Sequence, residues 1–354
     1  MKQKRWGIWL AIGLSLALML AACGGQPAAN QQQQPQEQPQ EEQHQDNNTS
    51  ASGNADLKIG IAQLVEHPSL DAAREGFIQA LLDHGFSKDN IDIKLAQGDP
   101  NTNTTIAQNF VADKKDLVLA IATSTAQAMV KEAEAVGMPV LFTAITDPLG
   151  ANLVSDLEKP GKNVTGTSDT HPDAIPLLMQ FIKDEFPDVQ TVGLIYNAGE
   201  QNAVVNVERA KAELEKLGLK SEEVTVATSA EVKQAAESLV GRVDVIYVPK
   251  DNTVVSALES VLQVGIEQKI PVFAGETDSV ERGALASYGL DYFQLGYKTG
   301  MMAVDILQNG VNPGDIPVGY PDDLGLVINA DAAEKMGVTI TDSMRSKAEA
   351  VINE

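Results

Sequence analysis

The sequence predicts an α/β protein with two doubly wound, Rossmann-like lobes, each a parallel sheet covered by helices on both faces. Three observations lead to this prediction. Short β-rich apolar runs alternate with helical patterns from residue 57 onward, and the alternation restarts near residue 191. Most runs are apolar throughout, as in strands that are buried on both faces. The chain of 354 residues is long enough for two such domains.

The first series of elements begins with an apolar run at residues 57–64, which predicts a strand. In the next segment, one helix face collects Leu70, Ala73, Phe77 and Leu81. Further strands are expected at residues 91–95, 117–121 and 140–145, with helices between them. This order is typical of a parallel sheet.

The second series begins with a strand at residues 191–196. The helix after it carries Val204, Val207, Ala210, Leu214 and Leu217 and is expected to end at Gly218, a favourable residue for a helix C-terminus. Strands at residues 243–248 and 271–274 enclose a helix that carries Val255, Leu258, Leu262 and Ile266. These elements predict a second sheet of the same kind.

The last predicted elements of the chain are expected to belong to the two lobes described above. We expect a strand at residues 284–288, a helix at 291–308, and a last strand and helix at 324–328 and 330–336. This tail is too small to fold alone, so it must complete existing lobes. The predicted boundaries are residues 57–165 and 284–318 for lobe 1, and residues 166–283 and 319–354 for lobe 2. Several crossings between lobes predict a multi-strand hinge, with ligand in the cleft.

The N-terminus has the pattern of an export signal. Lys2, Lys4 and Arg5 precede an apolar stretch too short to span a membrane comfortably. Residues 20–23, Leu-Ala-Ala-Cys, resemble the bacterial lipobox, which predicts a signal peptide at residues 1–22 and a lipid anchor on Cys23. The alternative is an ordinary signal with a chance cysteine. Residues 24–56 contain no Leu, Ile, Val or aromatic residue, so residues 23–56 are expected to form a lipidated cysteine and a disordered, Gln-rich tether.

Charge and cysteine content exclude several classes of function. The formal net charge is −23, which argues against nucleic-acid binding because phosphate contacts need clustered Lys and Arg. Cys23 is the only cysteine, so lipidation leaves no thiol for a disulfide, a zinc site or a nucleophile. We expect neither a metal nor a cofactor.

Candidate binding residues come after the predicted strands, because ligands of open α/β sheets bind beyond the carboxyl ends of the strands. Each of these residues alone is also explained as a helix cap, but both lobes supply them at the same edge. The candidates are Gln63, Ser124, Thr125, Thr146, Asp147, Glu200, Asn202, Asp251, Asn252 and Glu276. His67 lies near them and has a capping role as its alternative.

The charge of this edge favours a ligand that carries an ammonium group. Four of the candidates are acidic, whereas Lys250 is the single cation. Phosphates and dicarboxylates would call for Arg. A carboxylate on the same ligand can bind where Ser124 and Thr125 open a helix. Together these features predict a zwitterionic amino acid. The absence of Trp beyond residue 22 weakens a sugar-binding interpretation, and the candidate apolar walls are Phe142, Tyr196, Tyr247 and Tyr288.

Catalytic motifs are missing from the sequence. It contains no P-loop, no Gly-x-Gly-x-x-Gly, no Gly-x-Ser-x-Gly and no His-Glu-x-x-His. Its four histidines do not converge with Ser and Asp in the pattern of a triad. We therefore expect a binding protein and not an enzyme.

Several segments between residues 57 and 344 resemble the substrate-binding proteins of ABC transporters, in the branch that includes tryptophan- and tyrosine-binding lipoproteins. The matching segments are residues 59–71, 121–127, 145–148, 166–169, 196–202, 248–252 and 283–287, with Asp291-Tyr292. The resemblance implies the type I periplasmic-binding fold, capture of a small ligand between two closing lobes, and delivery to a membrane permease driven by an ATPase.

The resemblance also suggests roles for the candidate residues. Ser124 and Thr125 would take the ligand carboxylate, and Glu200 or Asp251 would take the ammonium. The residues that would orient the ligand are Gln63, Thr146, Asn202 and Asn252. The expected ligand is an aromatic amino acid such as tryptophan, tyrosine or phenylalanine, bound by a monomer anchored on the outer face of the cytoplasmic membrane, in a cell without an outer membrane.

Other interpretations of the same sequence remain open. The fold could bind a nucleoside, a peptide or a branched-chain amino acid, and the protein could be a ligand sensor for a membrane receptor. A lipid-anchored hydrolase would need a nucleophile and a base in the cleft. A transcription regulator with the same core would need an N-terminal helix-turn-helix, where a signal peptide stands instead.

Overall fold

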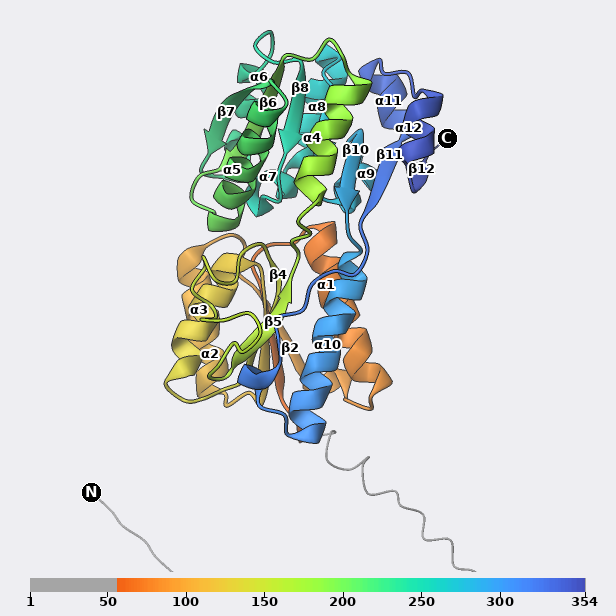
Figure 1. Ribbon diagram of the computed structural model, residues 1–354. Helices are drawn as coiled ribbons and strands as arrows, with labels where there is room; N and C mark the ends of the chain where they lie inside the picture. Colours follow the sequence, from red (N-terminus) through yellow and green to blue (C-terminus); the bar gives the residue numbers. More distant parts are fainter. Residues whose placement is uncertain (1–55, 354) are drawn as a thin grey trace, which may run out of the picture. The chain divides into compact units, whose positions relative to one another are not determined.

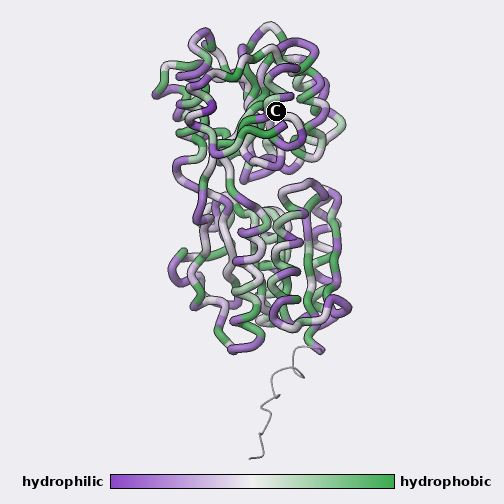
Figure 2. The backbone as a smooth tube through the Cα atoms, turned by 90° about the vertical axis from the view of Figure 1, so that its right-hand side faces the viewer, coloured by the Kyte–Doolittle hydropathy of each residue, from purple (hydrophilic) through white to green (hydrophobic). Residues whose placement is uncertain are grey.

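The computed structural model describes residues 56–353, which form two largely parallel sheets with helices on both faces (Figure 1). The signal peptide, the lipidated Cys23 and the tether predicted from the sequence lie outside the described residues. Buried strands appear as hydrophobic segments inside each lobe in Figure 2. The predicted fold class, two α/β lobes with parallel sheets, is confirmed.

The first lobe contains a five-stranded sheet in the order β2-β1-β3-β4-β5, and all of its strand pairs are parallel. The strands are β1 (Ile59–Gln63), β2 (Ile91–Leu95), β3 (Leu117–Ile121), β4 (Val140–Ile145) and β5 (Val164–Ser168). The helices are α1 (Pro68–Asp83), α2 (Pro100–Ala112), α3 (Thr123–Glu134) and α10 (Tyr292–Asn309). Local sequence fixes the helix starts: Asp99 and Asp291 each accept a backbone N–H in the first turn, of α2 and α10 respectively.

Alternate side chains of the first sheet enter two separate cores. Ile59 and Ile61 pack with Phe77 and Leu295 beneath α1 and α10. On the other face, residues such as Val118 pack beneath α2 and α3. Glycines let α1 and α10 approach closely, because a Cβ on Gly296 would lie 1.9 Å from the Ala73 carbonyl oxygen. The contact fixes α10, whose first residue is Tyr292, against the first lobe.

The second lobe contains a seven-stranded sheet in the order β12-β11-β10-β9-β8-β6-β7. Only β10 and β11 pair antiparallel within this sheet. The strands are β6 (Thr191–Asn197), β7 (Lys220–Val226), β8 (Val245–Val248), β9 (Val272–Ala274), β10 (Ala286–Gly289), β11 (Gly325–Asn329) and β12 (Ala350–Ile352). The helices are α4 (Ala174–Glu185), α5 (Gln201–Lys216), α6 (Val232–Ser238), α7 (Asn252–Ser256), α8 (Leu258–Gln268), α9 (Thr277–Glu281), α11 (Ala330–Met336) and α12 (Asp342–Lys347). Short 3₁₀ turns lie at Lys88–Asn90, Ser229–Glu231 and Pro313–Asp315.

The edge strands β7 and β12 do not have the apolar runs that predict the other strands. β7 reads Lys-Ser-Glu-Glu-Val-Thr-Val and buries only Val226 fully, and every residue of β12 is half-buried. An edge strand has a neighbour on one side only, so it tolerates polar residues that a central strand excludes.

The lobe boundaries differ from those predicted. Residues 166–168 continue β5 in the first sheet, whereas β10 pairs with β9 and β11 in the second sheet. The prediction that placed residues 166–168 in lobe 2 and residues 284–289 in lobe 1 was therefore wrong. Apolar patterning reveals that a strand exists, but long-range hydrogen bonding decides which sheet it joins. The chain crosses between the lobes after Ser168, between Gly289 and Tyr292, and after Gly319, which bridges to Thr167.

None of the helices within residues 56–353 has the length and apolar character needed to cross a membrane.

Candidate functional site

A small pocket lies where the carboxyl ends of both sheets meet, which is the edge at which open α/β sheets bind ligands. Most of its wall is polar, and both lobes contribute to it. The lining residues are His67, Leu70, Ala144, Thr146, Asp169, Asn202, Lys250, Asp251, Asn252, Glu276 and Tyr292. We call this space the central pocket.

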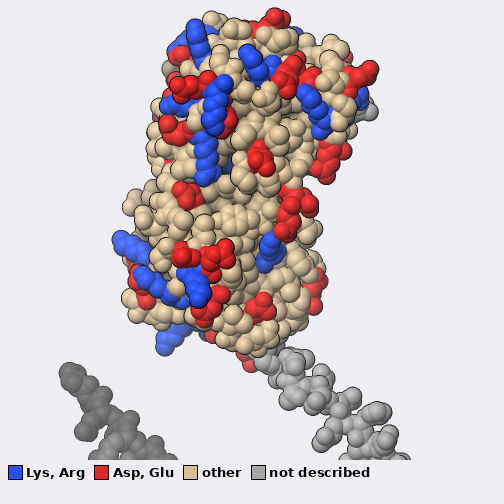
Figure 3. Space-filling model, viewed as in Figure 1, with Lys and Arg blue, Asp and Glu red and all other residues tan. Residues whose placement is uncertain are grey.

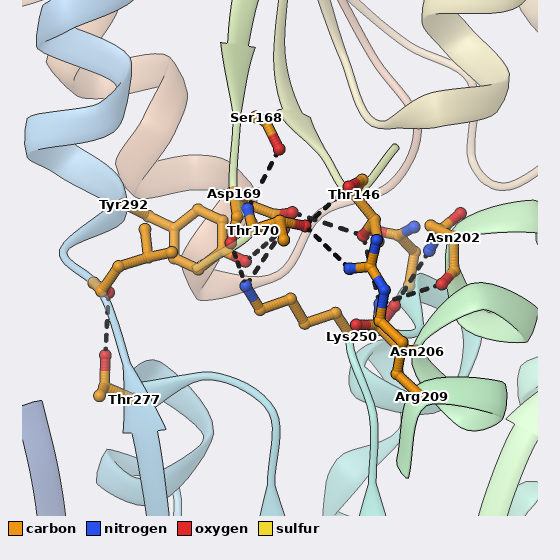
Figure 4. Close-up of polar contacts among 12 residues, drawn as sticks. Thr146, Ser168, Asp169, Thr170, Asn202, Asn206, Arg209, Lys250, Thr277 and Tyr292 are labelled. Carbon is orange, nitrogen blue, oxygen red and sulfur yellow. Dashed lines mark hydrogen bonds and ion pairs between the residues drawn. The ribbon is translucent and has the colours of Figure 1, made fainter. Parts of the chain in front are cut away.

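Two hydrogen bonds join the lobes directly at the central pocket. The His67 Nε2 atom lies 3.3 Å from Asn252 Oδ1, and the Asn206 amide donates to Thr146 Oγ1 at 3.2 Å. The second contact is visible in Figure 4. The other ring nitrogen of His67, Nδ1, is buried and has no hydrogen-bond partner among the described residues.

Asp169 lies at the centre of the hinge side of the pocket. Its carboxylate accepts a hydrogen bond from the Tyr292 hydroxyl at 2.8 Å and one from Thr146 at 3.4 Å. The Lys250 ammonium donates to the Asp169 carbonyl, and it lies 3.7 Å from the carboxylate (Figure 4). Burial raises the pKa of Tyr292 well above its ordinary value, and the Asp169 charge adds to this shift. Tyr292 therefore stays protonated and remains a donor.

Glu276 is the second acidic group at this side of the pocket. Only 3 % of the residue is exposed, and its carboxylate accepts a hydrogen bond from Ser279 at 2.9 Å. No Lys, Arg or His among residues 56–353 forms an ion pair with Glu276. Burial and the neighbouring Glu276 raise the pKa of Asp278 to about 6. This part of the pocket therefore suits a cation.

Glu200 is occupied by hydrogen bonds at the start of α7 and does not line the pocket. Its carboxylate accepts five hydrogen bonds: from the Asn252 N–H at 3.1 Å, the Asn252 amide at 2.6 Å, the Asn202 amide at 3.2 Å, the Thr253 N–H at 2.9 Å and the Thr253 hydroxyl at 2.7 Å. Few lone pairs remain for a ligand.

Asp251 lines the pocket but also has a structural role. It is the N-cap of α7, and it accepts the Val254 N–H at 2.8 Å and the Asn197 N–H at 2.5 Å. Burial raises the pKa of Asp251 to about 8, with a further contribution from the charge of Glu200. The expectation that Glu200 or Asp251 takes an ammonium group conflicts with these contacts, because backbone N–H groups already use both carboxylates.

The central pocket contains half of the predicted site residues. Those that line it are Thr146, Asn202, Asp251, Asn252 and Glu276. Those that do not are Gln63, Ser124, Thr125, Asp147 and Glu200. Gln63 bonds Asp71 and Arg74, Asp147 accepts the Gly150 N–H, and Thr125 donates to Asn103. The position of a polar residue at the end of a strand does not tell whether it caps a helix or contacts a ligand.

The four predicted aromatic walls also lie outside the central pocket. Phe142 is fully buried in the core of the first lobe, and Tyr196 donates to Glu223 at 2.9 Å. Tyr247 and Tyr288 line a neighbouring cavity of the second lobe.

Sequence reasoning gave no site role to Asp169 or Tyr292. Asp169 comes after β5, a strand that the apolar pattern did not reveal because it reads Val-Thr-Gly-Thr-Ser. Tyr292 comes after the helix cap Asp291. Both residues lie in segments that carry the resemblance to ABC-transporter proteins. This resemblance is the signal in the sequence that could have identified them as site residues.

The described residues contain no group of His, Cys, Asp and Glu placed to hold a metal ion. Charged side chains of both signs are interspersed over the face seen in Figure 3. Because most of its wall is polar, the central pocket is suited to binding and orienting a small polar ligand.

Comparisons with known proteins identify the family of this chain. Residues 58–352 match the family described as ABC transporter substrate binding protein. The chain is 44% identical over 292 residues to the tyrosine-binding protein of Clostridioides difficile, which covers 82% of this chain and 83% of that protein.

Two solved structures have the same fold as this chain. One is an ABC domain from Streptococcus pneumonia in complex with L-Trp, at 39% identity and a TM-score of 0.78, covering 83% of this chain and 100% of that one. The other is the ligand-free, open structure of a substrate-binding protein with adhesive properties from Clostridium difficile, at 44% identity and a TM-score of 0.62, covering 84% and 100%. The chain therefore belongs to the ABC transporter substrate-binding proteins.

Proposed function

We propose that this protein captures an aromatic amino acid in the central pocket and delivers it to the permease and ATPase of an importer. One observation carries the choice of a zwitterionic ligand: Glu276 is a buried carboxylate on the pocket wall, and no cation among the described residues pairs with it. A buried charge without a partner is costly by several kcal/mol. A ligand ammonium would offset that cost.

The named relatives support an aromatic side chain. The relative from Clostridioides difficile is named a tyrosine-binding protein, and the Streptococcus structure contains L-Trp. This chain superposes better on the L-Trp complex than on the open, ligand-free structure, although its identity to the latter is higher. The arrangement with lobes joined at His67 and Thr146 is consistent with a form ready to enclose a ligand.

The ammonium is expected between Glu276 and Asp169. Both carboxylates line the pocket; that of Asp169 accepts hydrogen bonds from the Tyr292 and Thr146 side chains and lies 3.7 Å from the Lys250 ammonium. Side-chain donors can be exchanged for a ligand with small rearrangements, whereas the backbone donors on Asp251 cannot. Thr146, Asn202 and Asn252 would orient the ligand.

The ligand carboxylate is assigned to the start of α3, as the sequence suggests for Ser124 and Thr125. This helix begins without a side-chain cap, after Ala122 at a φ of 77°. Two buried polar atoms next to it, Asn103 Nδ2 and Thr123 Oγ1, have no partner among the described residues. Free N–H groups at a helix N-terminus attract an anion. Ser124 and Thr125 do not line the central pocket itself, so this assignment requires the ligand to extend toward α3.

The site of action is inferred from the family and from the N-terminal sequence. Substrate-binding proteins of ABC importers work outside the cytoplasm. We infer that Cys23 carries the lipid that holds this one at the membrane, on the outer face of a cell lacking an outer membrane. Replacing Cys23 by Ser should move the protein from the membrane fraction to the medium; retention at the membrane would contradict the anchor.

Isothermal titration calorimetry with the twenty amino acids tests the function. We expect L-Tyr, L-Trp or L-Phe to bind with a Kd below about 100 µM, which corresponds to about −5.5 kcal/mol. A nucleoside and a branched-chain amino acid serve as competitors from the alternative ligand classes. If no amino acid binds that tightly to the folded protein, the amino-acid assignment is wrong.

A further inference from the structure

The hinge side of the central pocket contains a place that suits a cation, and a lysine of the protein itself occupies it. Three groups surround this place: the Asp169 carbonyl, the Asp169 carboxylate and the ring of Tyr292 (Figure 4). Each of them attracts a positive charge. We call this place the cation cradle. The Lys250 ammonium reaches it from the end of β8, donates to the Asp169 carbonyl and lies 5.9 Å from the centroid of the Tyr292 ring.

The ion pair that Lys250 forms in the cradle is a loose one. Its ammonium lies 3.7 Å from Oδ2 of Asp169, whereas a hydrogen-bonded ammonium and carboxylate are about 2.7–2.9 Å apart. Oδ2 accepts the Tyr292 hydroxyl at 2.8 Å, and Oδ1 accepts the long Thr146 bond at 3.4 Å. The Asp169 carboxylate therefore retains acceptor capacity for a cation that can approach more closely than Lys250 does.

The backbone of Lys250 is held in place, but its side chain can leave the cradle. The Lys250 carbonyl accepts the Asn202 amide at 3.0 Å, and a Cβ on Gly275 would lie 2.9 Å from the Lys250 nitrogen. The side chain itself is partly exposed and has a long, flexible stem. The ammonium can thus move into water while β8 and the start of α7 stay where they are.

We propose that Lys250 stands in for the ligand ammonium: it fills the cation cradle before the ligand binds and leaves the cradle when the ligand arrives. This inference rests on the proposed function, which places a zwitterion in the central pocket. It makes Lys250 a specificity-determining residue, because a ligand gains the cradle only if it brings a cation to replace the lysine. A ligand without an ammonium group leaves Lys250 in place.

The charge balance of the pocket explains why such an exchange is favourable. Asp169 and Glu276 are both buried, and buried carboxylates without a cation are costly. Lys250 supplies one positive charge before the ligand binds. A second cation in the same cradle would repel the first at short range, so the entering ammonium expels the lysine. The cradle holds one positive charge throughout, and the displaced lysine regains its hydration.

Replacement of Lys250 by methionine tests the exchange, because it removes the competing charge and keeps an unbranched side chain. The matched control is Lys115→Met. Lys115 is buried to a similar degree, pairs with Asp92 at 3.0 Å and lies 5.2 Å from the centroid of the Phe110 ring, but it does not line the central pocket. Calorimetry measures the Kd of each variant for three probes: L-Tyr, tyramine, which lacks the carboxylate, and desaminotyrosine, which lacks the ammonium. L-Trp, tryptamine and indolepropionate form a parallel set.

We expect Lys250→Met to bind L-Tyr and tyramine about three- to tenfold more tightly than the wild type, because neither ligand has to displace a lysine. Desaminotyrosine should bind no more tightly than it does to the wild type, and Lys115→Met should bind all three probes like the wild type. A merely structural role of Lys250 would shift all three affinities in the same direction. If thermal unfolding shows that Lys250→Met is not folded, Lys250→Gln repeats the test, since its amide can still donate to the Asp169 carbonyl without a charge.

Unchanged or weaker binding of L-Tyr by the folded variants would overturn the exchange. A loss for L-Tyr and desaminotyrosine, but not for tyramine, would instead make Lys250 the counter-ion of the ligand carboxylate. Both outcomes leave the proposed function intact, because the wild type still binds the amino acid. If the wild type binds no aromatic amino acid, both proposals fail. In a crystal structure of the L-Tyr complex, we expect the Lys250 ammonium outside the cradle, and a lysine that still donates to the Asp169 carbonyl contradicts the exchange.

Discussion

Two groups of acidic residues in this protein look alike in sequence but differ in what they are free to do. The first, which we call the α7 cluster, contains Glu200 and Asp251, and backbone N–H groups donate to both carboxylates. The second, the hinge cluster, contains Asp169 and Glu276, whose carboxylates accept hydrogen bonds from side chains only. Carboxylates of the first kind hold the fold, and those of the second kind can accept a ligand.

The difference arises from the backbone that lies next to each carboxylate. Asp251 directly precedes α7, and Glu200 faces the first two residues of the same helix, so the free N–H groups of its first turn use both carboxylates. Asp169 comes after a strand and precedes no helix directly, and Glu276 precedes α9 without a side-chain cap bond. Their oxygens therefore face the pocket and not a backbone.

The largest expected effect is on stability, from Glu200→Ala. The substitution removes the acceptor of two backbone N–H groups and three side chains, so the free energy of unfolding should fall by about 2–3 kcal/mol. Urea denaturation measures this change. Glu208→Ala, which removes an exposed partner of Lys211, is the matched control and should cost at most about 1 kcal/mol. Equal losses of unfolding free energy in the two variants would contradict the structural role of the α7 cluster.

For Glu276→Gln, we expect weaker ligand binding without a loss of stability. Loss of a buried charge without a cation should leave the free energy of unfolding unchanged or raise it. Affinity for the amino-acid ligand should fall by about 10- to 100-fold, or about 1.4–2.7 kcal/mol, because the ammonium loses its counter-charge. Calorimetry and urea denaturation of the same sample measure both quantities. A variant that binds normally would show that Asp169 alone meets the ammonium.

The α7 cluster should also make stability depend on pH. An unfolded Asp251 loses its proton near the ordinary aspartate pKa of 3.8, whereas the folded protein keeps that proton up to about pH 8. The folded state binds more protons in between, so this contribution to stability is full below pH 4 and is lost as pH rises toward 8. In Asp251→Asn the decline between pH 4 and pH 8 should be shallower. Parallel curves of unfolding free energy against pH would contradict the assignment.

The smallest expected effect concerns His67, which contacts Asn252 across the lobes at 3.3 Å. The contact exists only when the lobes meet, so it contributes to closure and not to the stability of either lobe. His67→Phe should weaken ligand binding by about two- to fivefold, or about 0.5–1 kcal/mol. The melting temperature without ligand should stay near that of the wild type. A large drop in this temperature would assign His67 to the core of the first lobe.

Much of the fold could be predicted because burial leaves a strong periodic signal. Central strands such as β3 and β8 are apolar throughout, and the helix start at Asp291 is explained by cap chemistry. β5 and β7 were not predicted, since one is rich in Thr and Ser and the other lies at an edge. Half of the predicted site residues line the central pocket. The ends of the strands locate candidate residues, but the hydrogen-bond partners of each side chain depend on segments far away in sequence.

Two α/β lobes, an acidic edge with one cation and the resemblance to a family of transport proteins can all be inferred from the amino-acid sequence, because these properties depend on composition, periodicity and local motifs. Which carboxylates remain available for a ligand depends on the folded structure. Glu200 meets Asn252 and Thr253 from 52 and 53 residues away, and Asp169 meets Tyr292 from 123 residues away. A carboxylate's availability depends on donors brought to it by folding, and no local pattern in the sequence records those donors.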